Sequence, residues 1–213
     1  MFWNTVSPLL GEILIDLMTN NLFKSFKLVG GTALSLQINH RMSDDIDLFT
    51  DAKYGSIDFK EIGSFLDNKY PYCSFRNIDN VTFGTYFDVG TSKDNFVKID
   101  FYYTDDFVFE TVFDGNVRMV SEKEIIAMKL NVVVNNGRKK DFWDLHYFLD
   151  KYSFKEMIMF YEKRYPYNDN SELLKTKIFD FEIADVEFDP QCLLSKNWDD
   201  IKLDFIEKIN TKF

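Results

Sequence analysis

Residues 28–49 read LVGGTALSLQINHRMSDDIDLF and decide the fold of this chain. A glycine pair, Gly30 and Gly31, ends one apolar run and opens a stretch of helical character. Asp45 and Asp47 then alternate with apolar residues along a second run. Side chains of an extended strand point alternately to the two faces of a sheet, so both carboxylates share one face. The stretch predicts a strand, a tight turn, a helix and a return strand.

Each half of this motif has a chemical use. Glycines ahead of a helix leave backbone amides at the helix start, where they and the helix dipole attract phosphate oxygens. An isolated glycine pair is more often an ordinary turn, but two neighbouring acids repel one another unless a cation lies between them. Together the halves predict a site for nucleotide phosphates and metal ions. Arg41, in the loop between them, either contacts phosphate or pairs with Asp44.

Asp100 is the third candidate acid and lies in the segment FVKIDFYY, residues 96–103. The apolar residues of this segment alternate onto one face, which places Lys98 and Asp100 on the other. On a neighbouring strand, Asp100 would join the two earlier acids to hold two magnesium ions about 3.5–4 Å apart. The alternative is a solvent-facing strand residue that binds nothing.

Lys129 lies in the middle of an apolar helical stripe. The residues three and four positions away are Ile125, Ile126, Val132 and Val133. A buried ammonium needs an anionic partner. Two interpretations remain open: the lysine extends along its aliphatic stem to solvent, or it reaches triphosphate oxygens.

A second helix opens with the basic residues 138–140 followed by Asp141, and Asp144 comes one turn later. Because the helix dipole favours acids near a helix start, Asp144 is interpreted as structural. Asp141 is predicted to orient either a nucleophile or Lys129.

Composition limits the class of protein. The chain has 213 residues, of which 46% are hydrophobic and 17% aromatic, enough for a substantial core in one large domain or two small ones. Its net charge of −10 argues against a surface devoted to nucleic acid, because such binding neutralises phosphates with Lys and Arg. A local basic patch remains compatible with this charge.

Several features predict a cytoplasmic protein. Residues 1–18 lack a basic leader and contain Glu12 and Asp16, so they resemble an amphipathic helix more than an export signal. No apolar run approaches the roughly 18 residues that a membrane span needs. Cys73 and Cys192 are far apart and lack metal-ligand spacing, so both are predicted to be structural thiols in a reducing compartment.

The periodicity of apolar residues predicts the order of the elements. In the front half we expect helices over residues 2–23, 32–38 and 57–68, and strands over residues 26–29, 45–50, 81–89, 96–103 and 107–119. From Ser121 the pattern is helical, because Ser121 and Glu124 form a capping-box signature and residues 135–137 (NNG) end the helix. A second helix over residues 140–152 and a mostly helical remainder follow, with an irregular acidic interval over residues 179–190.

Five blocks in chain order, GGTAL, HRxSxDIDLF, KID, MKL and RKKDFWDL, lie within residues 26–148. This set resembles the AbiEii/AbiGii toxin family of nucleotidyltransferases, a branch of the DNA polymerase β-like nucleotidyltransferase superfamily. The resemblance implies an α+β fold, with a mixed sheet flanked by helices and a mainly helical C-terminal part. We therefore expect a nucleotidyltransferase domain over residues 1–118 and a helical domain over residues 119–213.

The resemblance also implies magnesium-dependent transfer of a nucleoside monophosphate from a nucleoside triphosphate to an acceptor. Nucleotide binding is expected of Gly30, Gly31, Thr32, Arg41 and Lys129, and metal binding of Asp45, Asp47 and Asp100. Lys129 would stabilise the leaving pyrophosphate and Asp141 would position the acceptor. Two departures from the family pattern stand out. Thr32 replaces the usual Gly-Ser of the wider superfamily, and no block matches after Lys151.

By the same resemblance, members often serve as the toxin of a toxin–antitoxin or phage-defence system. A cognate antitoxin and a tRNA or protein acceptor are the partners this implies. One alternative is a small-molecule nucleotidyltransferase of the antibiotic-modifying kind, which suits the acidic charge. The other is a binding module of the same fold without turnover, against which the three retained acids argue.

Overall fold

The computed structural model describes residues 1–74 and 82–210. The chain forms two compact units. The sheet unit consists of Met1–Gln37, Ser43–Asp106 and Thr111–Val120, and the helical unit of Ile38–Met42, Phe107–Glu110 and Ser121–Phe213. Two short segments of the front half thus belong with the helical unit, although the sequence had placed one boundary after residue 118.

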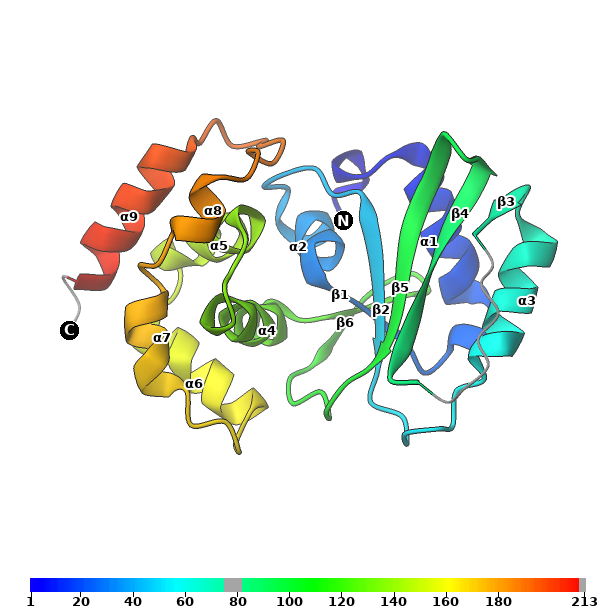
Figure 1. The fold of residues 1–213 in the computed structure, drawn as a ribbon, viewed down its shortest axis with the longest axis horizontal. Coiled ribbons are helices and arrows are strands. Elements are labelled where there is room, and N and C mark those ends of the chain that lie inside the picture. Colours follow the sequence, from blue (N-terminus) through cyan, green and yellow to red (C-terminus); the bar gives the residue numbers. More distant parts are fainter. Residues whose placement is uncertain (75–81, 211–213) are drawn as a thin grey trace. The chain divides into compact units, whose positions relative to one another are not determined.

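A mixed sheet organises the sheet unit (Figure 1). In the described part of the chain it has seven strands in the order β3-β4-β5-β2-β1-β7-β6. The strands are β1 (Lys27–Val29), β2 (Asp45–Thr50), β3 (Tyr72–Cys73), β4 (Gly84–Ser92), β5 (Asn95–Tyr103), β6 (Thr111–Asp114) and β7 (Val117–Val120). The central strand β2 runs antiparallel to β1 and parallel to β5.

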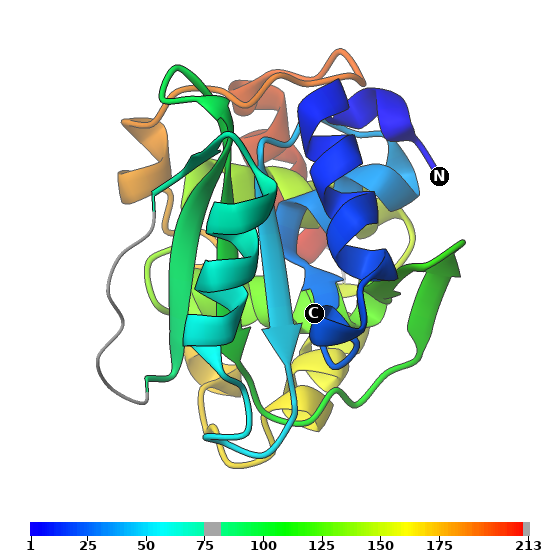
Figure 2. The same ribbon diagram turned by 90° about the vertical axis from the view of Figure 1, so that its right-hand side faces the viewer.

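Helices cover both faces of this sheet. They are α1 (Pro8–Thr19), α2 (Gly30–Ile38) and α3 (Phe59–Lys69). Helix α2 lies on one face, and α1 and α3 lie on the other, where they contact the strands (Figures 1 and 2). Alternate residues of β2 and β5 are fully buried, among them Ile46, Leu48 and Ile99. Because side chains alternate along each strand, one set packs into the core, and the other set points to the opposite face, where a site is able to form.

The helical unit is built around α4 (Glu122–Val134), which packs against several of its neighbours. The other elements are α5 (Lys139–His146), the 3₁₀ turn η3 (Tyr147–Asp150), α6 (Phe154–Arg164), α7 (Ser171–Lys177), α8 (Glu182–Asp185) and α9 (Trp198–Asn210). Ser153 caps α6 in a capping box with Glu156. Among the described residues, no helix is both long and apolar enough to cross a membrane.

Three sequence predictions about helices need correction. The helix expected over residues 2–23 is shorter, because the Ser7 hydroxyl caps α1 at Leu10 and Asn20 turns the chain into the 3₁₀ turn η2 (Asn21–Phe23), while η1 (Trp3–Thr5) precedes. The helix expected over residues 140–152 is α5, which ends at His146 and is followed directly by the 3₁₀ turn η3. The interval over residues 179–190 contains the short helix α8.

The capping box predicted at Ser121 is also wrong. Ser121 is the N-cap residue of α4, but its hydroxyl has no hydrogen-bond partner in the part of the chain that the structure describes. Glu124 instead forms an ion pair with Arg164, at 2.5 Å, and accepts hydrogen bonds from the backbone amides of Val108 and Phe109. A buried arginine and two amides thus draw the carboxylate away from the helix start.

The predicted hairpin is present as β4 and β5, which pair antiparallel with an irregularity between Gly90 and Ser92. Its expected first residue, Val81, lies outside the described residues. The strand expected over residues 107–119 is split into the hairpin of β6 and β7.

Candidate active site

The sheet brings the three predicted acids onto adjacent strands. In the parallel pairing of β2 and β5, Asp45 lies opposite Lys98 and Asp47 lies opposite Asp100. Because paired residues of neighbouring strands point to the same face, these four side chains share one face, here called the acid face. The alternation read from the sequence is therefore present, and Asp100 is buried beside its neighbours.

Gly30 brings the backbone close to the acid face. Its φ of +68° lies in the left-handed region that favours glycine, and a side chain added there would overlap the carboxylate of Asp47. Val29, just before it, is paired with Asp47 across β1 and β2. The start of α2 is thus positioned directly against the second acid, as a turn that cradles phosphate beside a metal ligand requires.

Thr32 has a role within the fold, and its predicted contact with a nucleotide stays a prediction. Its side chain is buried, and its hydroxyl hydrogen-bonds to the Ser43 hydroxyl at 2.9 Å and donates to the backbone carbonyl of Asp45. These bonds tie the first turn of α2 to the beginning of β2. Thr32 therefore holds the glycine turn and the acids together, which is a contribution that the sequence did not indicate.

Lys98 is the cation of the acid face. Its ammonium lies 2.6 Å from Oδ2 of Asp100. Partial burial alone would lower the pKa of Lys98, but the hydrogen bond to Asp100 and the charges of Asp100, Asp45 and Asp47 outweigh it and raise that pKa. The sequence placed Lys98 on this face but gave it no role.

Within residues 1–74 and 82–210, no group of three or more His, Cys, Asp or Glu side chains is arranged to hold a metal ion. The predicted magnesium set of Asp45, Asp47 and Asp100 is therefore not preformed. The three carboxylates nevertheless act together on one cation, Lys98, so their chemistry fits a positively charged ligand.

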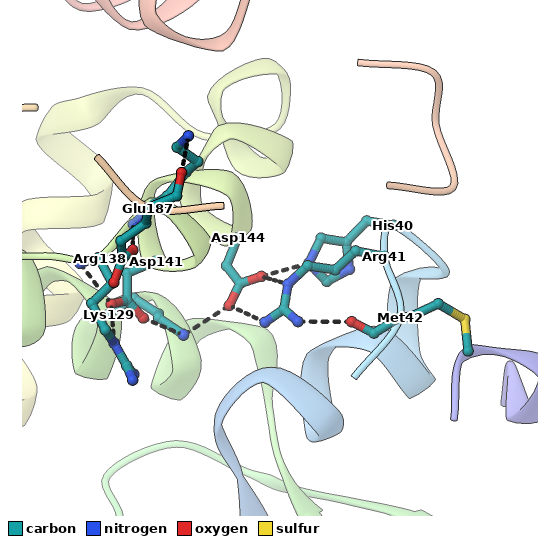
Figure 3. A network of polar contacts seen from close by, with 9 residues as sticks. His40, Arg41, Met42, Lys129, Arg138, Asp141, Asp144 and Glu187 are labelled. Carbon is teal, nitrogen blue, oxygen red and sulfur yellow. Dashed lines mark hydrogen bonds and ion pairs between the residues drawn. The ribbon is translucent and has the colours of Figure 1, made fainter. Parts of the chain in front are cut away.

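The other predicted site residues meet in the helical unit (Figure 3). Lys129 of α4 is buried, and its ammonium lies 2.6 Å from Asp141 and 2.8 Å from Asp144 of α5. The second carboxylate oxygen of Asp141 accepts a hydrogen bond of 3.0 Å from the backbone amide of Arg138. Asp141 therefore caps α5 and neutralises Lys129 at once. We call the cluster of His40, Arg41, Lys129, Asp141 and Asp144 the buried network.

Asp144 is the centre of the buried network. Arg41 binds both of its oxygens, with Nε at 2.6 Å and Nη2 at 3.0 Å, which is the bidentate geometry that guanidinium and carboxylate groups favour. The Nε2 atom of His40 lies 2.7 Å from the same carboxylate. Asp144 is therefore structural, as predicted, but through buried ion pairs and not through the helix dipole. The signal in the sequence was its position one turn after Asp141.

The pKa shifts in the network follow from burial and pairing. Burial alone would raise the pKa of Asp144, but the charges of Arg41 and Lys129 hold it well below the ordinary value. For Lys129 the two carboxylates overcome burial and raise the pKa. Burial lowers the pKa of His40 despite its contact with Asp144. The acids and the two cations are thus ionised at neutral pH, while His40 is neutral.

These contacts bear on two interpretations that the sequence left open. Lys129 does not extend to solvent, because its side chain is 9% exposed and held by two carboxylates. Arg41 is held by Asp144. Whether either residue contacts a nucleotide stays a prediction.

The sequence also matches known proteins. A family model described as "Nucleotidyl transferase AbiEii toxin, Type IV TA system" matches residues 12–211. This chain belongs to the AbiEii nucleotidyltransferase toxin family. The match spans both units. The AbiEii assignment therefore also covers the chain after Lys151, where the sequence analysis found no matching block.

Individual proteins are similar to this chain in sequence or in fold. An uncharacterized protein of Aquifex aeolicus is 27% identical, with 93% of each chain covered. A Helicobacter pylori protein described as a nucleotidyltransferase superposes with a TM-score of 0.58 at 20% identity, covering 94% of this chain and 92% of the other. The nucleotidyltransferase toxin MenT4 of Mycobacterium tuberculosis superposes with a TM-score of 0.50 at 11% identity, covering 94% and 83%.

The AbiEii family match and the shared fold confirm the predicted class and the α+β architecture. The chain is a nucleotidyltransferase of a toxin family. Families of this kind generally use a nucleoside triphosphate and a divalent metal ion.

Proposed function

We propose that this nucleotidyltransferase transfers a nucleoside monophosphate from a nucleoside triphosphate, with magnesium ions held by Asp45, Asp47 and Asp100. The observation that carries the proposal is the register of β2 and β5, which aligns Asp47 with Asp100 and places Asp45 on the same face. The start of α2 supports it, because Gly30 lies against the Asp47 carboxylate and aims a helix N-terminus at the same place.

In this mechanism the acceptor nucleophile attacks the α-phosphorus in line, and pyrophosphate leaves. Divalent cations bound at the acid face would neutralise the phosphate oxygens during that displacement. The backbone of Gly30 and Gly31 would bind phosphate oxygens. The bonds of Thr32 to Asp45 and Ser43 would keep the turn and the acids in register.

Lys98 would have to leave Asp100 when a divalent cation binds, because both cations need the same carboxylate. Its side chain is 42% exposed, so solvent is open to the released ammonium. Replacement of Lys98 by Met should therefore tighten the binding of Mn²⁺ or Mg²⁺ measured by calorimetry. Weaker or unchanged metal binding in Lys98→Met would contradict this competition, whatever the activity of the variant.

Lys129 is proposed to stabilise the leaving pyrophosphate, and Arg41 to contribute to nucleotide binding. Asp141 and Asp144 hold the Lys129 ammonium in one position and keep it charged, so this role requires Lys129 to exchange one of these contacts for a phosphate oxygen. Of the two predicted roles of Asp141, orientation of Lys129 is the one its 2.6 Å contact favours.

The acceptor is proposed to be a tRNA or a protein, and the physiological partner a cognate antitoxin, as suits a toxin of this family. One observation favours a second candidate, a small hydroxyl compound. The net charge of −10 disfavours long contacts with a polyanion, because those require neutralising cations. The acceptor class is therefore the feature that an experiment must resolve first.

The direct test incubates the purified protein with each α-labelled nucleoside triphosphate, magnesium, and total RNA, total protein or a small-molecule extract. Transfer of label by the wild type, but not by Asp47→Ala, would establish the chemistry and name both nucleotide and acceptor class. No transfer to any fraction, together with no magnesium-dependent nucleotide binding by calorimetry, would favour a binding module without turnover.

A further inference from the structure

A fourth carboxylate, that of Asp88, points to the acid face and has no part in the proposed transfer. Strand β4 pairs antiparallel with β5, and this register places Asp88 directly opposite Lys98. The two neighbours of Asp88 along the strand, Phe87 and Val89, are fully buried in the core. Because side chains alternate along a strand, Asp88 lies on the same face as Lys98.

Lys98 therefore has a carboxylate on each side of its own strand. Asp45 of β2 is its neighbour on one side and Asp88 of β4 on the other. Across an antiparallel pair, opposite Cβ atoms are about 4.5–5.5 Å apart, which the flexible four-carbon stem of a lysine spans easily. In this structure the ammonium instead extends along β5 to Asp100, at 2.6 Å. Rotation of the Lys98 side chain alone would bring it beside Asp88, without movement of a strand.

The ammonium of Lys98 is already on the β4 side of its strand. It lies 5.3 Å from the centroid of the Tyr86 ring, and the face of an aromatic ring attracts a cation. Tyr86 is opposite Asp100 and is two residues from Asp88 on β4. The ring thus borders both carboxylates, Asp100 across the strand pair and Asp88 along its own strand.

The side chain of Asp88 is half-buried and is not needed for the bonds that hold this part of β4. The backbone amide of Asp88 donates to the Ser74 hydroxyl at 2.7 Å, and its carbonyl accepts from the Ser74 amide at 2.9 Å. Among residues 1–74 and 82–210, the Asp88 carboxylate forms no ion pair. Replacement of this side chain therefore leaves both bonds to Ser74 in place.

Metal binding would reverse the electrostatics around Lys98. In this structure Lys98 is held by Asp100, and the charges of Asp45 and Asp47 also act on it. Divalent cations bound by those three carboxylates would cancel their attraction and repel the ammonium. Asp88 lies across β5 from the acids of β2, and none of the predicted metal contacts uses it. It is therefore a carboxylate of the acid face that still attracts the lysine.

We propose that Asp88 is a positioning residue for metal binding, which receives the ammonium of Lys98 when a divalent cation takes Asp100. The inference rests on the proposed function, because it requires metal at the acid face. It assigns the released lysine to a carboxylate and not to solvent. Metal binding then exchanges one ion pair of Lys98 for another, so the lysine keeps a counter-ion and competes less strongly with the metal.

The test measures binding of Mn²⁺, without nucleotide, from the electron paramagnetic resonance signal of the free ion. It compares the wild type, Asp88→Asn, Lys98→Met and the double variant. Asp88→Asn should weaken Mn²⁺ binding about threefold more when Lys98 is present than in the Lys98→Met background, as expected for loss of one exposed ion pair. Equal weakening in both backgrounds would show that Asp88 acts only through its long-range charge, and it would overturn the proposal.

Two further variants serve as controls. Asp88→Glu keeps the carboxylate and should bind Mn²⁺ as the wild type does. Asp94→Asn removes the same charge from the exposed turn after β4, so it should have the same small effect with and without Lys98. A loss in Asp88→Glu as large as that in Asp88→Asn would contradict the role of the carboxylate.

A crystal structure of the wild type with Mn²⁺ tests the same point without any variant. The ammonium of Lys98 should lie within ion-pair distance of Asp88, and an ammonium left in solvent or on Asp100 would overturn the proposal. Wild-type binding that needs Asp47 but shows no coupling between Asp88 and Lys98 would reject this inference and leave the proposed function standing. Absence of Mn²⁺ binding by the wild type would reject both.

Discussion

The acid face and the buried network both gather aspartates around a lysine, but the acid face is far more exposed to water. On the acid face, Lys98 is 42% exposed, and Asp45 and Asp47 are half-buried. In the network, Asp144 is fully buried and Lys129 is 9% exposed. An ion pair open to water is weak and easily exchanged, whereas breaking a buried pair leaves an uncompensated charge. The same residue types are therefore suited to ligand exchange in one unit and to stability in the other.

This contrast predicts opposite results from removing charge in the two places. A charge removed from the acid face should change activity and leave the fold intact. A charge removed from the buried network should destabilise the fold. The variants below test that division, beginning with the largest effect.

Asp47→Asn should lower nucleotidyl transfer by roughly a thousandfold, since loss of a metal ligand removes several kcal/mol of transition-state stabilisation. Its melting temperature should equal that of the wild type or exceed it, because like charges repel on the acid face. The control is Asp94→Asn in the exposed turn after β4, which removes the same charge elsewhere. Full transfer by Asp47→Asn would disprove the assignment of the acid face.

Lys129→Met should destabilise the protein by about 3–5 kcal/mol in urea unfolding, because Asp141 and Asp144 lose a buried counter-ion. Lys155→Met, on the exposed surface of α6, should cost less than about 0.5 kcal/mol. Adding Asp141→Asn to Lys129→Met should recover part of the loss, since it removes one unpaired charge. Equal stability of the two lysine variants would show that the network contributes nothing to the fold.

Gly30→Ala should cost about 1–3 kcal/mol of stability, because alanine is strained at a φ of +68°. It should also lower transfer by about 100-fold, since the added methyl group displaces the Asp47 carboxylate. Gly115→Ala separates the two causes. Gly115 has a φ of +56° and open space around it, so its variant should lose stability but keep full transfer. Similar transfer by both variants would contradict the contact with Asp47.

The smallest effect concerns pH. Burial lowers the pKa of His40 below the value of about 6.5 expected in the unfolded chain, so the unfolded state binds the proton more readily. The stability of the fold is therefore fully present above the pKa of His40 in the unfolded chain. It is lost as the pH falls through the lower pKa of His40 in the folded protein. His40→Gln, whose amide replaces the bond to Asp144, should unfold less steeply in acid. An unchanged slope between pH 7 and pH 5 would show that His40 titrates normally.

The sheet motif was predictable because its information is local. A two-residue period fixes which side chains share a face, so Asp45, Asp47 and Asp100 were placed on the correct faces before their strands were paired. The glycine pair was recognisable as a turn for the same reason. The two-residue period does not show which cation pairs with these acids. The role of Lys98 became clear only from its distance to Asp100 in the structure.

The buried network was less predictable because its partners are distant in the sequence. His40 and Arg41 bind a carboxylate more than one hundred residues later, and no local pattern carries such a pairing. The capping box at Ser121 failed for a related reason, since Glu124 found Arg164 forty residues away. Local propensity located most helices but not all of their ends, and it was wrong where a buried charge found a remote partner.

Residues 38–42 belong to the helical unit, so the chain cannot be cut into two fragments that each contain one complete unit. Those residues begin with the last residue of α2 and lead toward β2, inside the motif that carries the acids, yet they include both His40 and Arg41. A fragment that begins after residue 120 would contain Asp144 without either of them. In such a fragment, Lys129 would be the remaining cation of the network beside the buried Asp144. The helical unit is therefore not a contiguous piece of the chain, and it needs residues 38–42 to complete its ion pairs.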